Sequence, residues 1–205
     1  MHLVLAQINS TVGALRSNAD HILVVAKEAA ASGAEMIAFP ELALCGYPPE
    51  DLVLKPHFLQ DVEVELARLA RELPPQATVV VGAPRHLEGH TYNTAVAFRG
   101  GREILTYRKM LLPNYGVFDE KRVFAAGHEP AVLEVGGQRI GLHICEDSWF
   151  VEEAPCRLMA EAKVDAVLNI SASPYHRGKQ AVRERILTRA AHHIGAPLLY
   201  CNLAG

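Results

Sequence analysis

Two spacings of hydrophobic residues alternate along the chain, and each predicts a different kind of element. One stretch places apolar side chains at three- and four-residue steps, at Leu59, Val62, Leu66, Leu69 and Leu73. This spacing predicts an amphipathic helix that ends at Pro74-Pro75. The next apolar run, residues 77–83, is continuous and predicts a buried strand.

The same rules predict the remaining elements. Helices are expected from a cap at Ser17 or Asn18 to about Gly33, and at residues 153–162 and 179–194. Strands are expected at residues 3–8, 35–39, 93–98, 103–107, 132–135, 138–144, 164–170 and 197–203. Gly100-Gly101 and Gly136-Gly137 join two pairs of these strands as hairpins. This mixture predicts an α/β fold, with a mixed sheet or two packed sheets covered by helices.

Composition and net charge narrow the class of protein and the partners to be expected. The 205 residues carry a net charge of −3, and 50% of them are hydrophobic, which is ordinary for a globular protein. No basic cluster or membrane-length apolar run occurs, so neither a nucleic-acid nor a membrane partner is expected. The N-terminus has no basic leader, and the four cysteines match neither a disulfide framework nor a zinc site. We therefore expect a cytoplasmic protein with reduced thiols and no metal site.

Two long loops interrupt the regular elements. Residues 42–56 are rich in Gly and Pro, and residues 110–128 combine charges with large apolar groups. Loops of this length in a compact domain are usually functional or disordered. Because the second loop contains Tyr115, Phe118 and Phe124, we expect it to pack over another part of the fold.

Three residues with complementary chemistry lie at the carboxyl ends of predicted strands, namely Glu41, Lys109 and Cys145. Strand ends that share one edge of a sheet converge on a common crevice. There Glu41 can take the thiol proton, and Cys145 can attack a carbonyl-type carbon. Lys109 can lower the pKa of the thiol and then stabilise an oxyanion. The alternatives are a buried structural cysteine and a loop-end ion pair.

The motifs around these residues resemble one enzyme family. They are Pro40-Glu41-Leu42, Tyr107-Arg108-Lys109 with Leu112-Pro113, and Ile144-Cys145-Glu146-Asp147. Together they resemble the nitrilase, or carbon–nitrogen hydrolase, superfamily over essentially the whole chain. The resemblance implies an α-β-β-α sandwich of two mixed sheets flanked by helices. It also implies that Glu41, Lys109 and Cys145 form a catalytic triad.

Two further segments narrow the resemblance to one branch. Residues 46–52 (GYPPEDL) and 109–120 (KMLLPNYGVFDE) are similar to the glutaminase domains of glutamine-dependent NAD+ synthetases. This resemblance implies that Cys145 attacks the side-chain amide of glutamine and forms a glutamyl thioester, which water hydrolyses. The ammonia would pass to a synthetase domain, which uses ATP and Mg2+ to amidate nicotinic acid adenine dinucleotide to NAD+.

The resemblance also implies supporting roles. Glu120 would support Lys109, and the backbone N–H of Glu146 would share the oxyanion with Lys109. The residues that would contact glutamine or line its pocket are Tyr115, Glu146, Trp149, Ser173 and Lys179. Plainer alternatives are a surface charge for Glu120 and Lys179, a turn residue for Ser173 and core packing for Trp149.

Residues 1–205 are expected to form one nitrilase-like glutaminase domain that is incomplete at its C-terminal end. The chain stops directly after a predicted strand, and it has no Ser-Gly-Gly loop of the kind that binds ATP pyrophosphate in this branch. ATP and Mg2+ are therefore expected in a synthetase domain outside this chain, and no cofactor is expected within it. The resemblance further implies a homo-oligomer.

Two other functions stay open. A stand-alone nitrilase-type amidase would act on another small amide, and the GYPPEDL segment argues against it. A catalytically silent nitrilase-like scaffold needs no nucleophile, and the intact set of Glu41, Lys109 and Cys145 argues against that function. The other cysteines and His143 are expected to be structural.

Overall fold

The computed structural model describes residues 1–204 of the chain. Its helices are α1 (Leu15–Ala31), α2 (Pro56–Glu72), α3 (Glu120–Val123), α4 (Ala154–Ala162) and α5 (Lys179–Ile194), with the 3-10 turns η1 (Glu50–Leu54) and η2 (Cys145–Ser148). Its strands are β1 (Leu3–Leu5), β2 (Met36–Ala38), β3 (Thr78–Leu87), β4 (His90–Arg99), β5 (Arg102–Arg108), β6 (Val132–Val135), β7 (Gln138–Ile144), β8 (Ala166–Ser171) and β9 (Leu198–Asn202).

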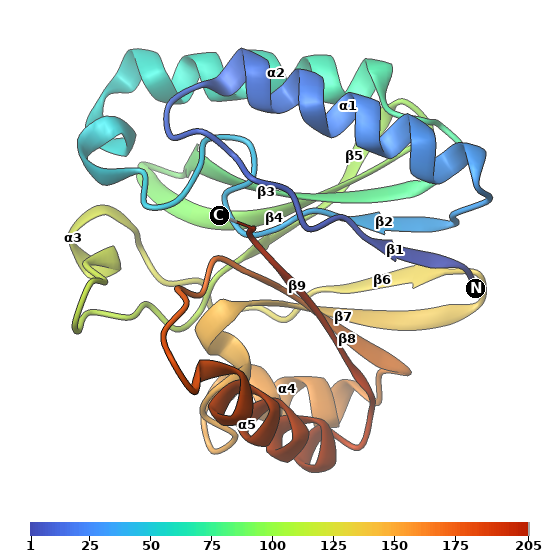
Figure 1. The fold of residues 1–205 in the computed structure, drawn as a ribbon, viewed down its shortest axis with the longest axis vertical. Helices are drawn as coiled ribbons and strands as arrows, with labels where there is room; N and C mark the ends of the chain where they lie inside the picture. The colour runs from blue at the N-terminus through green and yellow to red at the C-terminus, as the bar shows by residue number, and fades with distance from the viewer. Residues whose placement is uncertain (205) are drawn as a thin grey trace.

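Two mixed sheets pack face to face with helices on both outer sides (Figure 1). The first sheet has the order β1-β2-β3-β4-β5, in which two parallel pairs precede two antiparallel pairs. The second has the order β6-β7-β8-β9, in which one antiparallel pair precedes two parallel pairs. Figure 1 shows α1 and α2 over the first sheet, and α4 and α5 over the second. The predicted α-β-β-α sandwich is therefore confirmed.

Alternation along the strands divides the apolar core into three layers, because successive side chains point to opposite faces of a sheet. On β3, Val79 and Val81 pack with the α1 and α2 layer, whereas Val80 packs between the sheets. On β7, Ile144 packs between the sheets. Its neighbour His143 is fully buried and points to the other face of the sheet.

Most predicted elements lie within a few residues of the observed ones, but two expectations need correction. The predicted cap at Ser17 or Asn18 is wrong, because α1 begins at Leu15. The Asn18 amide instead bonds both backbone groups of Thr11 and holds the preceding loop. The strand expected at residues 77–83 continues to Leu87, because it pairs along its length with β4.

The second long loop packs over the fold only in part. Phe124 is buried as expected, whereas Tyr115 and Val117 are exposed. A short helix, α3, interrupts the loop and brings the buried side chain of Glu120 inward. The loop therefore contributes to a buried polar site as well as to the core.

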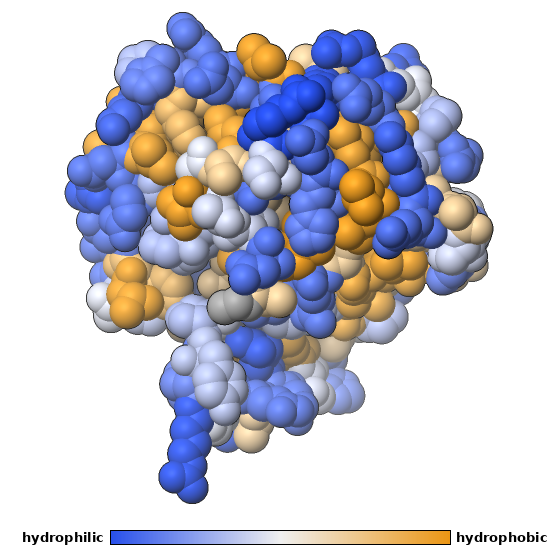
Figure 2. Space-filling model, turned by 45° about the horizontal axis from the view of Figure 1, so that its top comes forward, coloured by the Kyte–Doolittle hydropathy of each residue, from blue (hydrophilic) through white to orange (hydrophobic). Residues whose placement is uncertain are grey.

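The outer surface mixes polar and apolar side chains. Figure 2 shows hydrophilic residues with smaller hydrophobic areas between them on the face turned toward the viewer. Val24 on α1 and Val64 on α2 are among the exposed apolar residues. Within residues 1–204, no helix combines the length and the apolar character needed to cross a membrane.

Gly82 on β3 lies directly beneath the turn that carries Glu41. A Cβ atom added at Gly82 would collide with the carbonyl oxygen of Pro40 and the backbone nitrogen of Leu42. Neither backbone atom can move aside without displacing the turn. A glycine is therefore required here for close packing, and the position of Glu41 depends on it.

We expect Gly82→Ala to lower the free energy of unfolding by about 1–3 kcal/mol, as overpacked cores do. Gly141→Ala is a matched control, because its added methyl group meets the flexible thioether of Met159 rather than backbone. Urea denaturation of both variants measures the difference. Equal losses of stability in the two variants would contradict the proposed constraint on the Glu41 turn.

Candidate active site

The ends of three strands bring Glu41, Lys109 and Cys145 together. Glu41 follows β2 after two intervening residues, while Lys109 and Cys145 directly follow β5 and β7. Lys109 Nζ lies 2.7 Å from Glu41 Oε1, and both side chains are buried. The charges of Glu41 and Lys109 both reach the Cys145 thiol, since they shift its pKa in opposite directions. The two sheets thus contribute to a single polar cluster.

Three donors hold the Glu41 carboxylate. Oε1 accepts hydrogen bonds from Asn93 Nδ2 at 2.8 Å and from Lys109 Nζ at 2.7 Å. Oε2 accepts one from the backbone N–H of Ala172 at 2.8 Å. Ala172 follows β8 of the second sheet, whereas Asn93 lies on β4 of the first. The carboxylate therefore links the two sheets and has one fixed orientation.

Lys109 is fully buried and is shared by two carboxylates. Its Nζ also donates to both oxygens of Glu120, at 2.8 Å and 2.9 Å. Burial by itself would lower the pKa of Lys109, but the charges of Glu41 and Glu120 outweigh burial and hold that pKa well above its ordinary value. Lys109 therefore stays positively charged.

Glu120 titrates much higher than an exposed glutamate. Burial and the nearby negative charge of Glu41 raise the pKa of Glu120 to about 7, although Lys109 opposes the shift. The predicted alternative of a surface charge is wrong, because the side chain is only 4% exposed. The cluster can thus gain or lose a proton near neutral pH.

Cys145 begins η2 in a strained backbone conformation. Its φ of +45° lies in the left-handed region, which residues other than glycine rarely adopt. Its carbonyl oxygen accepts a hydrogen bond from Asn169 Nδ2 at 3.0 Å. A sharp turn of this kind is held in place by its surroundings and lies next to a polar cluster, which favours a functional role.

The thiol of Cys145 rests in the protonated form. Burial and the negative charge of Glu41 raise its pKa well above the ordinary value, and the opposing effect of Lys109 is smaller. Lys109 does lower this pKa, as expected, but burial and Glu41 raise it by more. Attack by Cys145 consequently requires a base to take its proton during the reaction, and Glu41 is the nearby carboxylate.

Asp147 is one of the residues whose roles were missed in the sequence. Its Oδ1 accepts hydrogen bonds from the backbone N–H groups of Met110 at 3.1 Å and Leu111 at 2.8 Å. Its Oδ2 accepts from Tyr107 Oη at 2.8 Å and from the backbone N–H of Ile144 at 2.9 Å. Burial raises the pKa of Asp147 to about 6, against the effect of these donors.

This carboxylate joins the strand end that carries Lys109 to the strand end that carries Cys145. The sequence signal for it was a second carboxylate two residues after the cysteine, in a turn that directly follows an apolar strand. A carboxylate buried at such a position must find hydrogen-bond donors. Only the fold reveals that those donors come from both sides of the site.

A second polar network lies behind Cys145 and is fully buried. Asn169 Nδ2 also donates to Ser148 Oγ at 2.7 Å, and Ser171 Oγ donates to Asn169 Oδ1 at 2.7 Å. His143 Nδ1 lies 2.9 Å from Ser148 Oγ. Burial lowers the pKa of His143 to about 4, so the imidazole is neutral at physiological pH. This network supports the Cys145 turn from the interior.

Four of the predicted substrate-contacting residues lie in two pairs. Tyr115 Oη donates to Glu146 Oε1 at 2.5 Å, although the Tyr115 side chain is largely exposed. Lys179 Nζ lies 4.4 Å from the centre of the Trp149 ring, a distance typical of a cation–π contact. Burial and the charge of Arg183 lower the pKa of Lys179, and Cys145 also acts on it electrostatically. Lys179 therefore lies beside Trp149, the residue that ends the turn begun by Cys145.

Ser173, the fifth predicted contact residue, is buried just after β8. Its Oγ accepts a hydrogen bond from Arg183 Nη2 at 3.2 Å, and its backbone N–H donates to Asn202 Oδ1 at 2.9 Å. Arg183 also lies over the Tyr200 ring, 5.2 Å from its centre. Arg183 was missed in the sequence, where its position four residues after Lys179 on one helix was the available signal.

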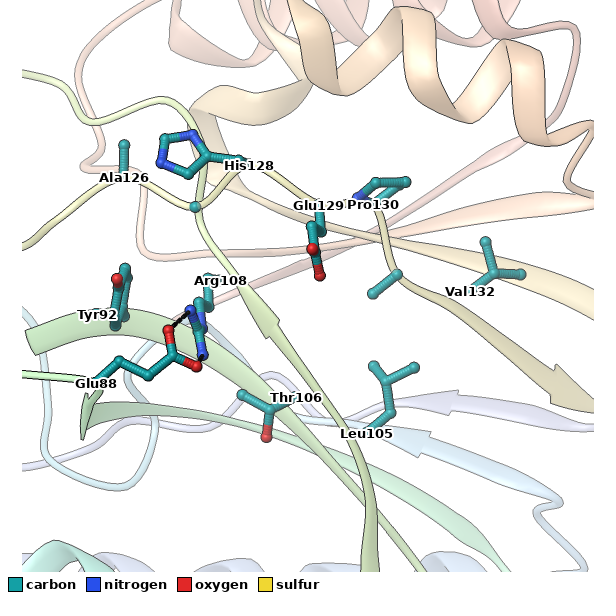
Figure 3. A pocket seen from close by; sticks show the side chains of 12 residues that line it. Glu88, Tyr92, Leu105, Thr106, Arg108, Ala126, His128, Glu129, Pro130 and Val132 are labelled. Atoms are coloured by element: carbon teal, nitrogen blue, oxygen red, sulfur yellow. Dashed lines mark hydrogen bonds and ion pairs between the residues drawn. The ribbon is translucent and has the colours of Figure 1, made fainter. Parts of the chain in front are cut away.

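A cavity of about 580 Å³ lies on a different side of β5, and it is lined mainly by residues of β5 and of the loop before β6. Figure 3 shows Arg108 paired with Glu88 there, with Tyr92 close by. None of Glu41, Lys109 and Cys145 lines this cavity. Arg108 and Lys109 point to opposite sides because they are adjacent at the end of a strand.

The acidic side chains around Cys145 are bound to protein donors. Glu41, Glu120 and Asp147 all accept hydrogen bonds from neighbouring side chains. Within the described part of the chain, no group of three or more His, Cys, Asp or Glu residues has the arrangement of a metal site. The side chains of Cys145, Glu41 and Lys109 bring a thiol, a carboxylate and an ammonium group to this site.

Comparisons with known proteins agree with the motifs. A family model described as carbon-nitrogen hydrolase matches residues 3–205. A glutamine-dependent NAD(+) synthetase from Synechocystis is 38% identical over 219 residues, which cover 99% of this chain and 39% of that protein. The predicted family and branch are therefore confirmed, and the chain spans about two fifths of the length of this relative.

Solved structures share the fold. Glutamine-dependent NAD+ synthetase from Acinetobacter baumannii, in complex with ADP, matches with a TM-score of 0.89 and 35% identity over 98% of this chain and 38% of that chain. A variant of the amidase from Nesterenkonia sp. AN1 matches with a TM-score of 0.84 and 25% identity, over all of this chain and 76% of that chain. Its active-site cysteine carries the acetamide moiety of fluoroacetamide.

We expect Asp147→Asn to lower the free energy of unfolding by about 3 kcal/mol or more, because an amide has one acceptor oxygen for four buried donors. Asp165→Asn is a matched control, since the exposed Asp165 carboxylate accepts a single backbone hydrogen bond from Arg139. We expect the control to lose less than about 1 kcal/mol in urea denaturation. An equally small loss for Asp147→Asn would show that its four hydrogen bonds contribute little.

His143 should make the protein acid-sensitive. Its pKa is about 4 in the folded state and 6.5 when unperturbed, so the unfolded chain binds a proton first as the pH falls. The contribution of neutral His143 to the free energy of unfolding is complete above pH 6.5. It should fall by roughly 2–4 kcal/mol as the pH approaches 4. Urea denaturation at pH 7 and pH 4.5 tests this, because His143→Gln should lose less stability than wild type on acidification. Equal losses of stability in wild type and His143→Gln would contradict this role of His143.

Proposed function

The chain belongs to the carbon–nitrogen hydrolase family, and on that premise we propose that it hydrolyses the side-chain amide of glutamine. The observation that carries the proposal is the buried cluster in which Lys109 contacts Glu41 beside the strained Cys145 turn. A nucleophile, a base and a cation then follow three strand ends of the two packed sheets. The relatives that are named glutamine-dependent support the choice of substrate.

The reaction begins with attack by Cys145 Sγ on the amide carbon of the glutamine side chain. As the C–S bond forms, the thiol proton moves to Glu41. The high pKa of the buried thiol supports this order, because a free thiolate would be disfavoured before substrate is present. Glu41 is held by Asn93 and Ala172, so its orientation does not depend on the substrate.

The tetrahedral intermediate carries a negative oxygen that needs donors fixed in advance. Lys109 Nζ and the backbone N–H of Glu146 supply them. When the intermediate collapses, the C–N bond breaks and the leaving nitrogen takes the proton from Glu41. The products of this half-reaction are ammonia and a glutamyl thioester on Cys145.

Water completes the cycle. Glu41 takes a proton from the water molecule as its oxygen attacks the thioester carbonyl. The second tetrahedral intermediate uses the same donors, and its collapse breaks the C–S bond. The proton returns from Glu41 to the cysteine sulfur as glutamate leaves, so the thiol and the carboxylate are restored.

The charges around the Cys145 turn complement the amino-acid end of glutamine. Lys179 would pair with the α-carboxylate, and Glu146 would pair with the α-ammonium group. Tyr115, Trp149 and Ser173 would border the substrate. The Tyr115–Glu146 hydrogen bond supports such a shared site, because it already joins two of the loops that surround Cys145.

We further propose that the ammonia is consumed by a synthetase domain outside these residues. The chain covers 38% of the Acinetobacter baumannii NAD+ synthetase, whose structure contains ADP. By this proposal the synthetase domain uses ATP and Mg2+ to amidate nicotinic acid adenine dinucleotide to NAD+. A homo-oligomer stays a prediction from the family resemblance.

A second candidate function is hydrolysis of another small amide. The Nesterenkonia amidase supports it, because the match covers all of this chain and 76% of that chain. Acetamide and propionamide represent this substrate class. They therefore serve as competing substrates in the test.

We expect the chain to release ammonia from glutamine faster than from acetamide or propionamide. Cys145→Ala should lower the rate by about 10³-fold or more, because it removes the nucleophile. A coupled glutamate dehydrogenase assay measures the ammonia. Mass spectrometry after rapid acid quenching should detect a glutamyl adduct on Cys145.

Cys201→Ala is the matched control for the loss of a buried thiol. Cys201 lies on β9, where its Sγ donates to the carbonyl oxygen of Ala38. The control should keep most of the activity. Glutamine hydrolysis that survives in Cys145→Ala would disprove the mechanism, and a preference for acetamide or propionamide would favour the second function.

A further inference from the structure

Tyr47 belongs to the GYPPEDL segment, yet the proposed reaction assigns it no role. Its hydroxyl donates a hydrogen bond to Glu120 Oε1 at 2.9 Å. Its ring makes an edge contact with Phe118, with the ring centres 6.4 Å apart, and Phe118 makes a similar contact with Tyr115. Tyr47 thus connects the buried carboxylate to the loop that borders the site.

The hydrogen bonds of Lys109 leave no donor for an oxyanion. An ammonium group has three N–H donors. The Nζ atom of Lys109 lies within hydrogen-bond distance of three carboxylate oxygens, namely Glu41 Oε1 and both oxygens of Glu120. To stabilise a tetrahedral intermediate, Lys109 must turn one N–H away from one of these oxygens.

Glu120 Oε1 is the oxygen that can release Lys109 most easily. Within residues 1–204, the hydrogen bonds to the Glu120 carboxylate come from Lys109 and Tyr47, and both reach Oε1. Glu120 Oε2 has no second donor and would be left unpaired. Glu41 Oε1 would keep Asn93, but it belongs to the proposed base, which Lys109 helps to orient. After the turn, Lys109 would still hold Oε2 and Tyr47 would still hold Oε1.

We propose that Tyr47 is a positioning residue, whose hydroxyl keeps Glu120 Oε1 hydrogen-bonded while Lys109 turns one N–H to the oxyanion. The proposal rests on the proposed function. Without the hydroxyl, the turn would leave a buried carboxylate oxygen unpaired, which opposes the turn. Tyr47 therefore acts through Glu120 and Lys109 and does not touch the reacting atoms.

The pH at which Glu120 titrates is a second, independent measure of its hydrogen bond with Tyr47. The charged and titratable groups that face it are Lys109 after β5, Glu41 after β2, Tyr47 before η1 and Cys145 in η2. The Tyr47 hydrogen bond lowers the pKa of Glu120, which is about 7. Removal of the hydroxyl should therefore move the midpoint to higher pH.

The test compares Tyr47→Phe with Tyr92→Phe. Phenylalanine keeps each ring and removes only the hydroxyl. Tyr92 is buried on β4 against Arg108, outside the cluster of Glu41, Lys109 and Glu120. We expect Tyr47→Phe to lower kcat for glutamine on the order of 10- to 100-fold, with KM changed by less than about threefold. We expect Tyr92→Phe to behave as wild type.

Two further measurements distinguish positioning from a loss of structure. The ¹³C carboxyl signal of Glu120, assigned by its absence in Glu120→Gln, should titrate at higher pH in Tyr47→Phe. In a double-mutant cycle, Tyr47→Phe should have little further effect on kcat in the Glu120→Gln background. Circular dichroism spectra and melting temperatures show whether each variant is folded.

The outcomes separate this proposal from the proposed function. If wild type does not hydrolyse glutamine, the proposed function fails and the role of Tyr47 fails with it. If wild type is active and Tyr47→Phe keeps its kcat and its Glu120 titration, only the role of Tyr47 is overturned. A loss of kcat that persists unchanged in the Glu120→Gln background would likewise overturn it, because Tyr47 would not act through Glu120.

Discussion

One buried ammonium group shared by two buried carboxylates is the interaction on which the site depends. The side chains of Lys109, Glu41 and Glu120 are 0%, 1% and 4% exposed. A buried charge that loses its partner is strongly destabilising, so the segments that carry these three residues must remain in register with one another. The cluster therefore determines where the Glu41 turn, the end of β5 and α3 lie. Burial and the charge of Glu41 together also keep the neighbouring Cys145 thiol protonated.

The two-sheet architecture makes such a cluster possible. Glu41 and Lys109 follow strands of the first sheet, whereas Cys145 follows a strand of the second. Separate sheets could slide relative to each other if only apolar contacts joined them. The hydrogen bond from Ala172 to Glu41 and those from the β5 end to Asp147 resist this movement. Polar contacts between the sheets thus set the geometry, while the apolar core supplies most of the stability.

The comparisons suggest where the specificity of this chain arises. The Nesterenkonia amidase shares the sandwich at 25% identity, so the sandwich alone does not select a substrate. The long loops around Cys145 can change in sequence without disturbing the core, whereas the strands cannot. Tyr47 and Tyr115 lie on these loops and contact the buried carboxylates Glu120 and Glu146. By the proposed function, substrate choice and reactivity are coupled through side chains that are close in space but far apart in sequence.

Local patterns in the sequence determined the helices, most strands, the family and the strand-end positions of Glu41, Lys109 and Cys145, because hydrophobic spacing and turn residues act over a few residues. The tertiary structure decided the hydrogen bonds and pKa shifts that depend on residues distant in the sequence. It gave Asn18 a loop to hold instead of a helix to cap, and it gave Asp147 donors from two strand ends. It also decided the net pKa shift of Cys145, because burial and Glu41 raise that pKa by more than Lys109 lowers it. Burial and long-range charge are sums over the folded chain, and no short stretch of sequence contains them.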